Sequence, residues 1–138
     1  MIARSSLSNI EHVWSADPAL DHDADGFVEK WKAHLRGAPA STLPCVVGDK
    51  LTVFKLRPLD SKGWRRVLPL PAVDSDYECV ALCLVGIDGL TIDGAPFVVE
   101  TSGNRVTEKC LSAIYDPGLF HELASKIAEA SQLLPFRG

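Results

Sequence analysis

The clearest pattern of apolar and polar residues along the chain is helical. Phe27, Trp31 and Leu35 are spaced four residues apart and therefore share one face of a helix. We expect this helix to begin at Gly26, with Asp25 as its cap. Comparable signals predict further helices at residues 61–68, 76–85 and 107–114 and, after Asp116-Pro117, along the apolar stripe of Phe120, Leu123, Ile127 and Ala130.

Strand signals fall mainly between the first two helices. Residues 45–47 and 51–57 are rich in β-branched and aromatic residues and flank the turn-forming residues 48–50, which predicts a β-hairpin. Residues 1–24 show no sustained period, and we expect an arm there with one short helical stretch at 7–14. The order of elements predicts an α+β fold. It comprises the arm at 1–24 and a single globular domain at 25–138, with a helix, the hairpin and a mostly helical C-terminal half.

Composition narrows the classes of protein to which the chain can belong. Its 138 residues are enough for one core, and 46% apolar with 23% charged residues is typical of globular domains. The formal net charge of −4 provides no positive field, so we expect no nucleic-acid partner. The longest apolar run, 80–85, is far shorter than a membrane helix, and residues 1–10 do not form a secretory signal. We therefore expect a cytoplasmic protein without a membrane contact.

The residue types that most often perform chemistry are not arranged in a catalytic motif. The four cysteines include no C-x-x-C pair, and we expect free buried thiols. The four histidines show no metalloprotease spacing, and we expect them on the surface or along helices. No glycine-rich phosphate loop occurs in the sequence. We accordingly expect no enzymatic activity and no cofactor.

One loop resembles a calcium site in its first half. Asp21, Asp23 and Asp25, followed by Gly26, match the first six positions of a D-x-D-x-D-G calcium loop, and Glu29 falls at the ninth position. The twelfth position, which normally supplies a bidentate carboxylate, is Lys32, and the aspartates also suit the positive N-terminus of the following helix. A calcium-regulated binding module that uses Asp21, Asp23, Asp25 and Glu29 is therefore an alternative, whereas the main interpretation has no metal.

Several residues are typical of surfaces that contact other proteins. Trp14 is an isolated tryptophan in the polar arm, and we expect it to dock on this domain or on a partner. Tryptophan and arginine are the residues most enriched in interface hot spots. The remaining expected contacts are the aromatic and basic run Trp64, Arg65 and Arg66, and the apolar terminal residues Leu133, Leu134 and Phe136.

Short apolar patterns and turn residues between 51 and 134 resemble those of bacteriophage tail assembly chaperones. The similar segments are FKLRPL at 54–59, VALCLVGIDGL at 80–90, RVT at 105–107, DPGL at 116–119 and IAEASQL at 127–133. The resemblance covers about three fifths of the chain and includes no catalytic signature. Residues 1–42 have no evident counterpart in that family.

This resemblance implies a non-enzymatic protein that acts in the host cytoplasm during virion assembly. Members of the family bind the tape-measure and tail-tube proteins through apolar grooves and also self-associate, which makes a homo-oligomer an expectation here. An alternative within the same biology is a minor structural protein of the virion, such as a connector, decoration or tail-associated subunit. In that case its partners are capsid or tail subunits, and it remains in the particle.

Overall fold

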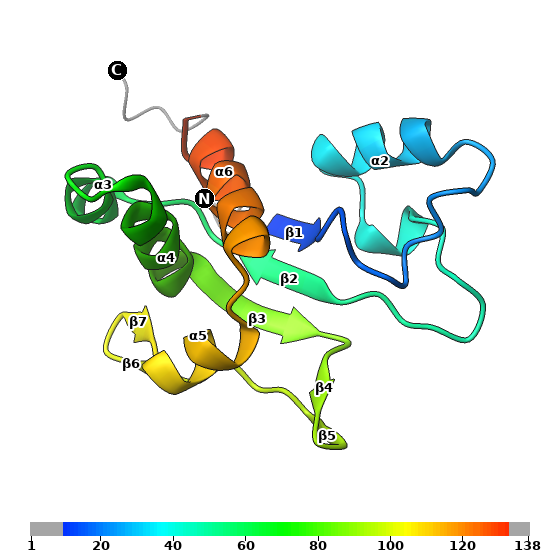
Figure 1. Cartoon of the computed structure of the whole chain (residues 1–138). Coiled ribbons are helices and arrows are strands. Elements are labelled where there is room, and N and C mark those ends of the chain that lie inside the picture. The colour runs from blue at the N-terminus through cyan, green and yellow to red at the C-terminus, as the bar shows by residue number, and fades with distance from the viewer. Residues whose placement is uncertain (1–9, 133–138) are drawn as a thin grey trace, which may run out of the picture.

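A computed structural model describes residues 10–132 of the chain, and its fold is α+β as expected (Figure 1). Strands and helices alternate along the first part, and two short hairpins precede the last two helices. The elements are β1 (Ile10–Val13), α2 (Phe27–Leu35), the 3-10 helix η1 (Ala40–Thr42), β2 (Val53–Leu56), α3 (Ser61–Val67), α4 (Ala72–Cys83), β3 (Leu84–Asp88), β4 (Thr91–Ile92), β5 (Ala95–Pro96), β6 (Thr101–Ser102), β7 (Arg105–Val106), α5 (Glu108–Ile114) and α6 (Pro117–Gln132).

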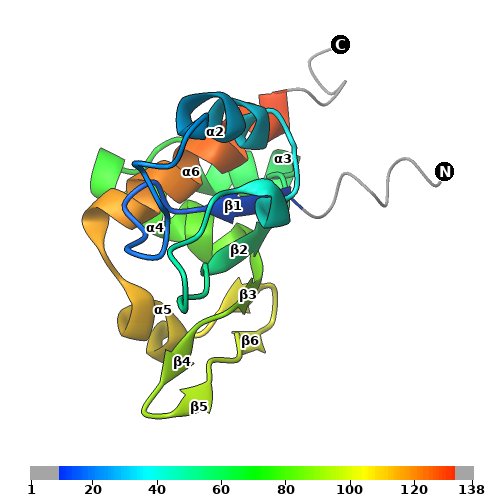
Figure 2. The same ribbon diagram turned by 90° about the vertical axis from the view of Figure 1, so that its right-hand side faces the viewer.

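The central element is an antiparallel sheet of three strands in the order β1-β2-β3. His12 of β1 lies opposite Phe54 of β2, and Phe54 lies opposite Ile87 of β3. The hairpins β4-β5 and β6-β7 form separate two-stranded sheets, and the first of them projects away from the central sheet (Figure 2). Their turns use residues suited to positive φ, since Asp93, Gly94 and Gly103 have φ values of 54°, 80° and 67°.

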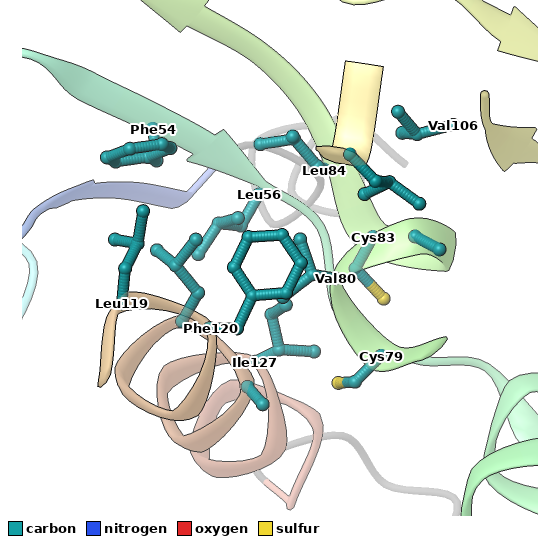
Figure 3. Packing of buried hydrophobic residues seen from close by; sticks show 14 of the residues in the cluster. Phe54, Leu56, Cys79, Val80, Cys83, Leu84, Val106, Leu119, Phe120 and Ile127 are labelled. Carbon is teal, nitrogen blue, oxygen red and sulfur yellow. The ribbon is translucent and has the colours of Figure 1, made fainter. Parts of the chain in front are cut away.

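The main core lies between the sheet and the helices α4 and α6, which pack against each other. Phe120 of α6 lies beside Leu56 of β2 and Val80 of α4 in the middle of this core (Figure 3). The predicted stripe on α6 is confirmed for Phe120, Leu123 and Ile127, which are fully buried, whereas Ala130 is half-buried. Within residues 10–132, no helix is long and apolar enough to cross a membrane.

A second, smaller core covers the β1 end of the sheet. It consists of Val13, Leu20, Ala40 and Leu43, with Trp31 of α2 packed against it. The segment between β1 and β2 therefore folds back over the strand that precedes it. This arrangement places α2 at one end of the molecule and α3 at the other (Figure 1).

Two predictions for the first half of the chain are wrong. The stretch expected to be helical at 7–14 contains the strand Ile10–Val13, and residues 7–9 lie outside the described part of the chain. Residues 10–20 of the expected arm are part of the fold, because Val13 and Leu20 are buried. The sequence shows no alternation here because the neighbouring residues His12 and Val13 are both buried, although they point to opposite faces of β1.

The expected hairpin at 45–57 is also wrong. Cys45 forms an isolated bridge with Leu20, and Val47 is 99% exposed, so residues 45–47 do not pair with 53–56. The strand β2 pairs instead with β1 and β3. One of these partner strands, β3, lies in the apolar run for which the sequence predicts a helix to residue 85. The helix ends at Cys83, and Leu84–Asp88 forms β3. A short apolar run fits a buried strand as well as a helix.

The predicted helix ends are confirmed where a side chain caps the backbone. The Thr107 hydroxyl accepts the N–H of Cys110 at the start of α5, and the Asp116 carboxylate accepts the N–H groups of Gly118 and Leu119 at the start of α6. Asp25 does not cap α2, which begins instead after Gly26 in the left-handed conformation at φ 74°.

Candidate functional site

An open groove of about 580 Å³ lies between β2, β4, α5 and α6. Its lining is mainly apolar and includes Trp14, Phe54, Leu90, Ile92, Ile114 and Leu119. Phe54 and Leu119 are buried and belong to the main core, whereas Trp14 is half-buried. The expected docking of Trp14 on its own domain is therefore observed, and the same side chain remains partly exposed in the groove.

The polar rim of this groove is held by Asp17, which is buried. One carboxylate oxygen accepts the N–H of Ala19 at 2.9 Å, and the other accepts the N–H of Thr52 at 3.0 Å. These bonds tie the segment after Trp14 to the segment before β2. Because both oxygens are engaged within the chain, we assign Asp17 a structural role at the rim.

Glu122 of α6 fixes the backbone on both sides of Trp14. Its Oε2 accepts hydrogen bonds from His12 Nε2 at 2.6 Å and from the Ser15 N–H at 2.8 Å, while Oε1 accepts one from the Ser15 hydroxyl at 2.5 Å. Burial raises the pKa of Glu122, but these hydrogen bonds outweigh it, so the pKa lies below the usual range. A charged Glu122 therefore holds residues 12 and 15, and with them Trp14, against α6.

His34 of α2 holds the outer edge of β1. Its ring is 1% exposed; Nδ1 donates to the Ala38 carbonyl at 2.8 Å, and Nε2 accepts the N–H of Val13 at 3.2 Å. Burial is the main cause that lowers the pKa of His34, and the neutral ring is the form that can accept from Val13. The ring of His12 stacks on that of His34 with centroids 5.9 Å apart.

The expectation that the histidines lie on the surface or along helices is wrong for His12, which is in a strand and 2% exposed, and His34 is buried although it lies on a helix. The Ser15 hydroxyl donates to the Glu122 carboxylate and does not contact a histidine ring among the described residues. These side chains therefore do not form an activated nucleophile, and their bonds orient the groove wall. The only sequence signal for His12 is its position beside the apolar Val13.

A second cavity, of about 380 Å³, lies between the end of β2, α3 and the end of α4. It is lined by three cations, Arg57, Lys62 and Arg66, together with Asp60. The Arg57 guanidinium is fixed by two hydrogen bonds to the Leu82 carbonyl, at 3.2 Å from Nε and 3.0 Å from Nη2. We call this the cationic pocket.

Of the contact residues expected on α3, only Arg66 reaches this pocket. Arg66 also pairs with Glu78 at 3.0 Å, and Arg65 is exposed. Trp64 packs partly against the main core, and its Nε1 is buried without a partner among the described atoms. The structure therefore separates Trp14, in the groove, from Trp64, on α3. Leu133, Leu134 and Phe136 lie outside the described residues.

An ionic network joins α4 to β7 and α5 next to this pocket. Arg105 contacts Glu78 at 3.0 Å and Glu108 at 2.6 Å. The hydrogen bonds to Glu78 are the largest cause that raises the pKa of Arg105. Tyr77 donates to Glu108 at 2.7 Å; burial, followed by this hydrogen bond, raises the pKa of Tyr77 to about 12. The network fixes the β6-β7 hairpin on α4.

The aspartates of the calcium-like loop are not brought together. Asp21 accepts the N–H of Asp23 through its carboxylate, while Asp23 and Asp25 are exposed. Over residues 10–132, no group of three or more His, Cys, Asp or Glu side chains is arranged to hold a metal ion, so Glu29 does not complete a site there. This geometry does not support the calcium alternative.

The four cysteines are free, and three of them, Cys79, Cys83 and Cys110, are buried as expected, whereas Cys45 is only half-buried. The hydrogen bond with Cys79 and then burial raise the pKa of the Cys83 thiol. A raised pKa keeps the thiol protonated and unreactive. Cys79 and Cys83 of α4 and Cys110 of α5 therefore pack as small apolar side chains in the main core.

Comparison of the chain with family models, curated proteins and solved structures gives no match.

Proposed function

We propose that this protein is a non-enzymatic phage morphogenesis protein that works through protein–protein contacts, as tail assembly chaperones do. The observation that supports this function is the apolar groove beside Trp14. A groove of this kind accepts an apolar segment of a partner protein, and the resemblance of residues 51–134 to tail assembly chaperones makes the tape-measure or tail-tube protein the expected partner.

The groove is suited to binding because the backbone of its wall is already positioned. Trp14 is held on both sides by Glu122, so little side-chain or backbone entropy is lost when a partner covers it. Aromatic anchors in apolar pockets contribute most of the binding energy of many interfaces. Each Å² of apolar surface removed from water contributes about 25 cal/mol before the costs of association.

The test is co-expression of the protein with the tape-measure and tail-tube proteins of the same phage, followed by measurement of binding. We expect Trp14→Ala to weaken binding about 30-fold or more, the effect of losing a hot-spot residue worth about 2 kcal/mol. Ala113→Glu places a charge in the groove from the exposed face of α5 without removing a core contact, and we expect a similar loss. Val28→Ala, on exposed α2, is the matched control and should bind normally.

Wild-type affinity in both groove variants, with folding confirmed by circular dichroism, would contradict the proposal. Mass spectrometry of purified particles then separates the two assembly roles. A chaperone is released and is absent from particles, whereas a stoichiometric presence would establish the alternative of a connector, decoration or tail-associated subunit.

A further inference from the structure

Two surfaces of opposite charge lie at opposite ends of the molecule. The first is the acidic loop, residues 21–25, with the carboxylates of Asp21, Asp23 and Asp25. None of these carboxylates forms an ion pair with another described residue, and their loop lies before α2 at one end of the fold (Figure 1). The second is the cationic pocket beside α3 at the other end.

The backbone of the acidic loop has a defined shape. The Asp21 N–H donates to the Pro44 carbonyl at 3.0 Å, and the Ala24 N–H donates to the Asp21 carbonyl at 3.2 Å. The side chains of Asp23 and Asp25 form no hydrogen bond with any described residue and point their charges to solvent. A short turn with a defined backbone thus presents these carboxylates to a partner, and within residues 10–132 they form no metal-binding group.

The cations of the cationic pocket are available to bind an anion. Arg57 is oriented by the Leu82 carbonyl, which cannot neutralise its charge, and Lys62 has no carboxylate partner among the described residues. Asp60, the acid of the lining, accepts the Gly63 N–H and offsets one of these charges, and Arg66 pairs with Glu78, so the lining keeps a smaller net positive charge. Fixed guanidinium groups bind carboxylates with defined geometry. The pocket thus carries a charge opposite to the net charge of the chain, which is −4.

We propose that the acidic loop of one molecule docks in the cationic pocket of a second copy. The two surfaces are too far apart to meet within one chain, because α2 and α3 lie at opposite ends of the fold (Figure 1). A contact between two different surfaces of identical chains repeats head to tail and builds a ring or an open filament. The inference is independent of the groove, since Trp14 belongs to neither surface.

Sedimentation velocity over a range of protein concentrations tests this contact. We expect reversible association at about 50 mM salt that is lost at about 500 mM, because exposed ion pairs are screened. Lys62→Glu and the double variant Asp23→Lys with Asp25→Lys should each be monomeric at concentrations where the wild type associates. Both changes are at exposed residues, so folding should be retained.

Mixing the two variants gives the sharpest readout. The Lys62→Glu chain keeps a normal acidic loop and the double variant keeps a normal cationic pocket, so the mixture should associate although neither variant does so alone. Lys109→Glu, an identical charge change on exposed α5, is the control and should behave like the wild type. A wild type that stays monomeric at low salt, association that survives in the variants, or a mixture that stays monomeric would each overturn the proposal.

Discussion

Acid should destabilise this protein through His34 before it affects the carboxylates. In the folded chain the neutral ring donates to Ala38 and accepts from Val13, and burial lowers its pKa from the ordinary value of 6.5. The nearby charges of His12 and Lys126 lower this pKa further, whereas the Ala38 hydrogen bond and Glu11 raise it. At pH values between the folded and the unfolded pKa of His34, the unfolded chain binds one more proton than the folded chain. The contribution of His34 to the free energy of unfolding is therefore fully present above about pH 6.5 and declines below it.

The expected magnitude follows from that single proton. One extra proton on the unfolded state changes the free energy of unfolding by at most about 1.4 kcal/mol per pH unit. The loss has a structural reason: a proton on Nε2 turns an acceptor into a donor that faces the N–H of Val13 at 3.2 Å. The β1 edge then loses its bond to α2. Glu122, whose pKa is lowered, adds its own loss only at more acidic pH.

Urea unfolding at a series of pH values between 7.5 and 5 measures this dependence. The comparison is with His34→Gln, which cannot bind a proton in this range. We expect the free energy of unfolding of His34→Gln to decline less steeply with falling pH than that of the wild type. The two slopes should differ by up to about 1.4 kcal/mol per pH unit, the value for one proton, even if the variant is less stable at every pH. Equal slopes in the two proteins would refute the assignment of a neutral, structural His34.

Two further predictions concern backbone groups held inside the fold. Ser131→Ala removes the hydroxyl that accepts the buried N–H of Leu59 at 2.8 Å, and chemical unfolding should show a loss of about 1–3 kcal/mol; an unchanged midpoint would contradict it. Gly89→Ala would place a Cβ 2.2 Å from the Leu51 carbonyl oxygen at φ 85°, whereas Gly94→Ala meets no atom within 4 Å at φ 80°. Thermal unfolding should therefore show a clearly larger loss for Gly89→Ala than for this control, and similar losses would rule out the close approach.

Local sequence signals predict the helices of the fold, whereas they do not predict the strand pairing of the central sheet. Thr107 and Asp116 predict the starts of α5 and α6 because a capping side chain bonds to a backbone N–H within four residues of it. The strand β3 follows α4 without a break in the apolar run, and β1 meets β2 across about forty residues, so no local pattern identifies either pairing. Strand pairing depends on tertiary contacts that a short window does not contain.

The candidate groove was predictable only through Trp14, an aromatic residue in polar surroundings. Glu122, which fixes it, looks like any solvent-facing carboxylate on an amphipathic helix, since its partners are 107 and 110 residues away. The charges of the cationic pocket are likewise spread over β2, α3 and their connection. Their convergence comes from the sheet topology and not from any motif.

The bonds between Glu122 and the residues around Trp14 also set an order for folding during synthesis. His12 is among the first described residues to leave the ribosome, and Glu122 is among the last. The chain grows from its N-terminus, and contacts between distant residues form late because long loops must close first. The groove wall is therefore fixed only after α6 has emerged, so an unfinished chain does not yet present the groove in its final form.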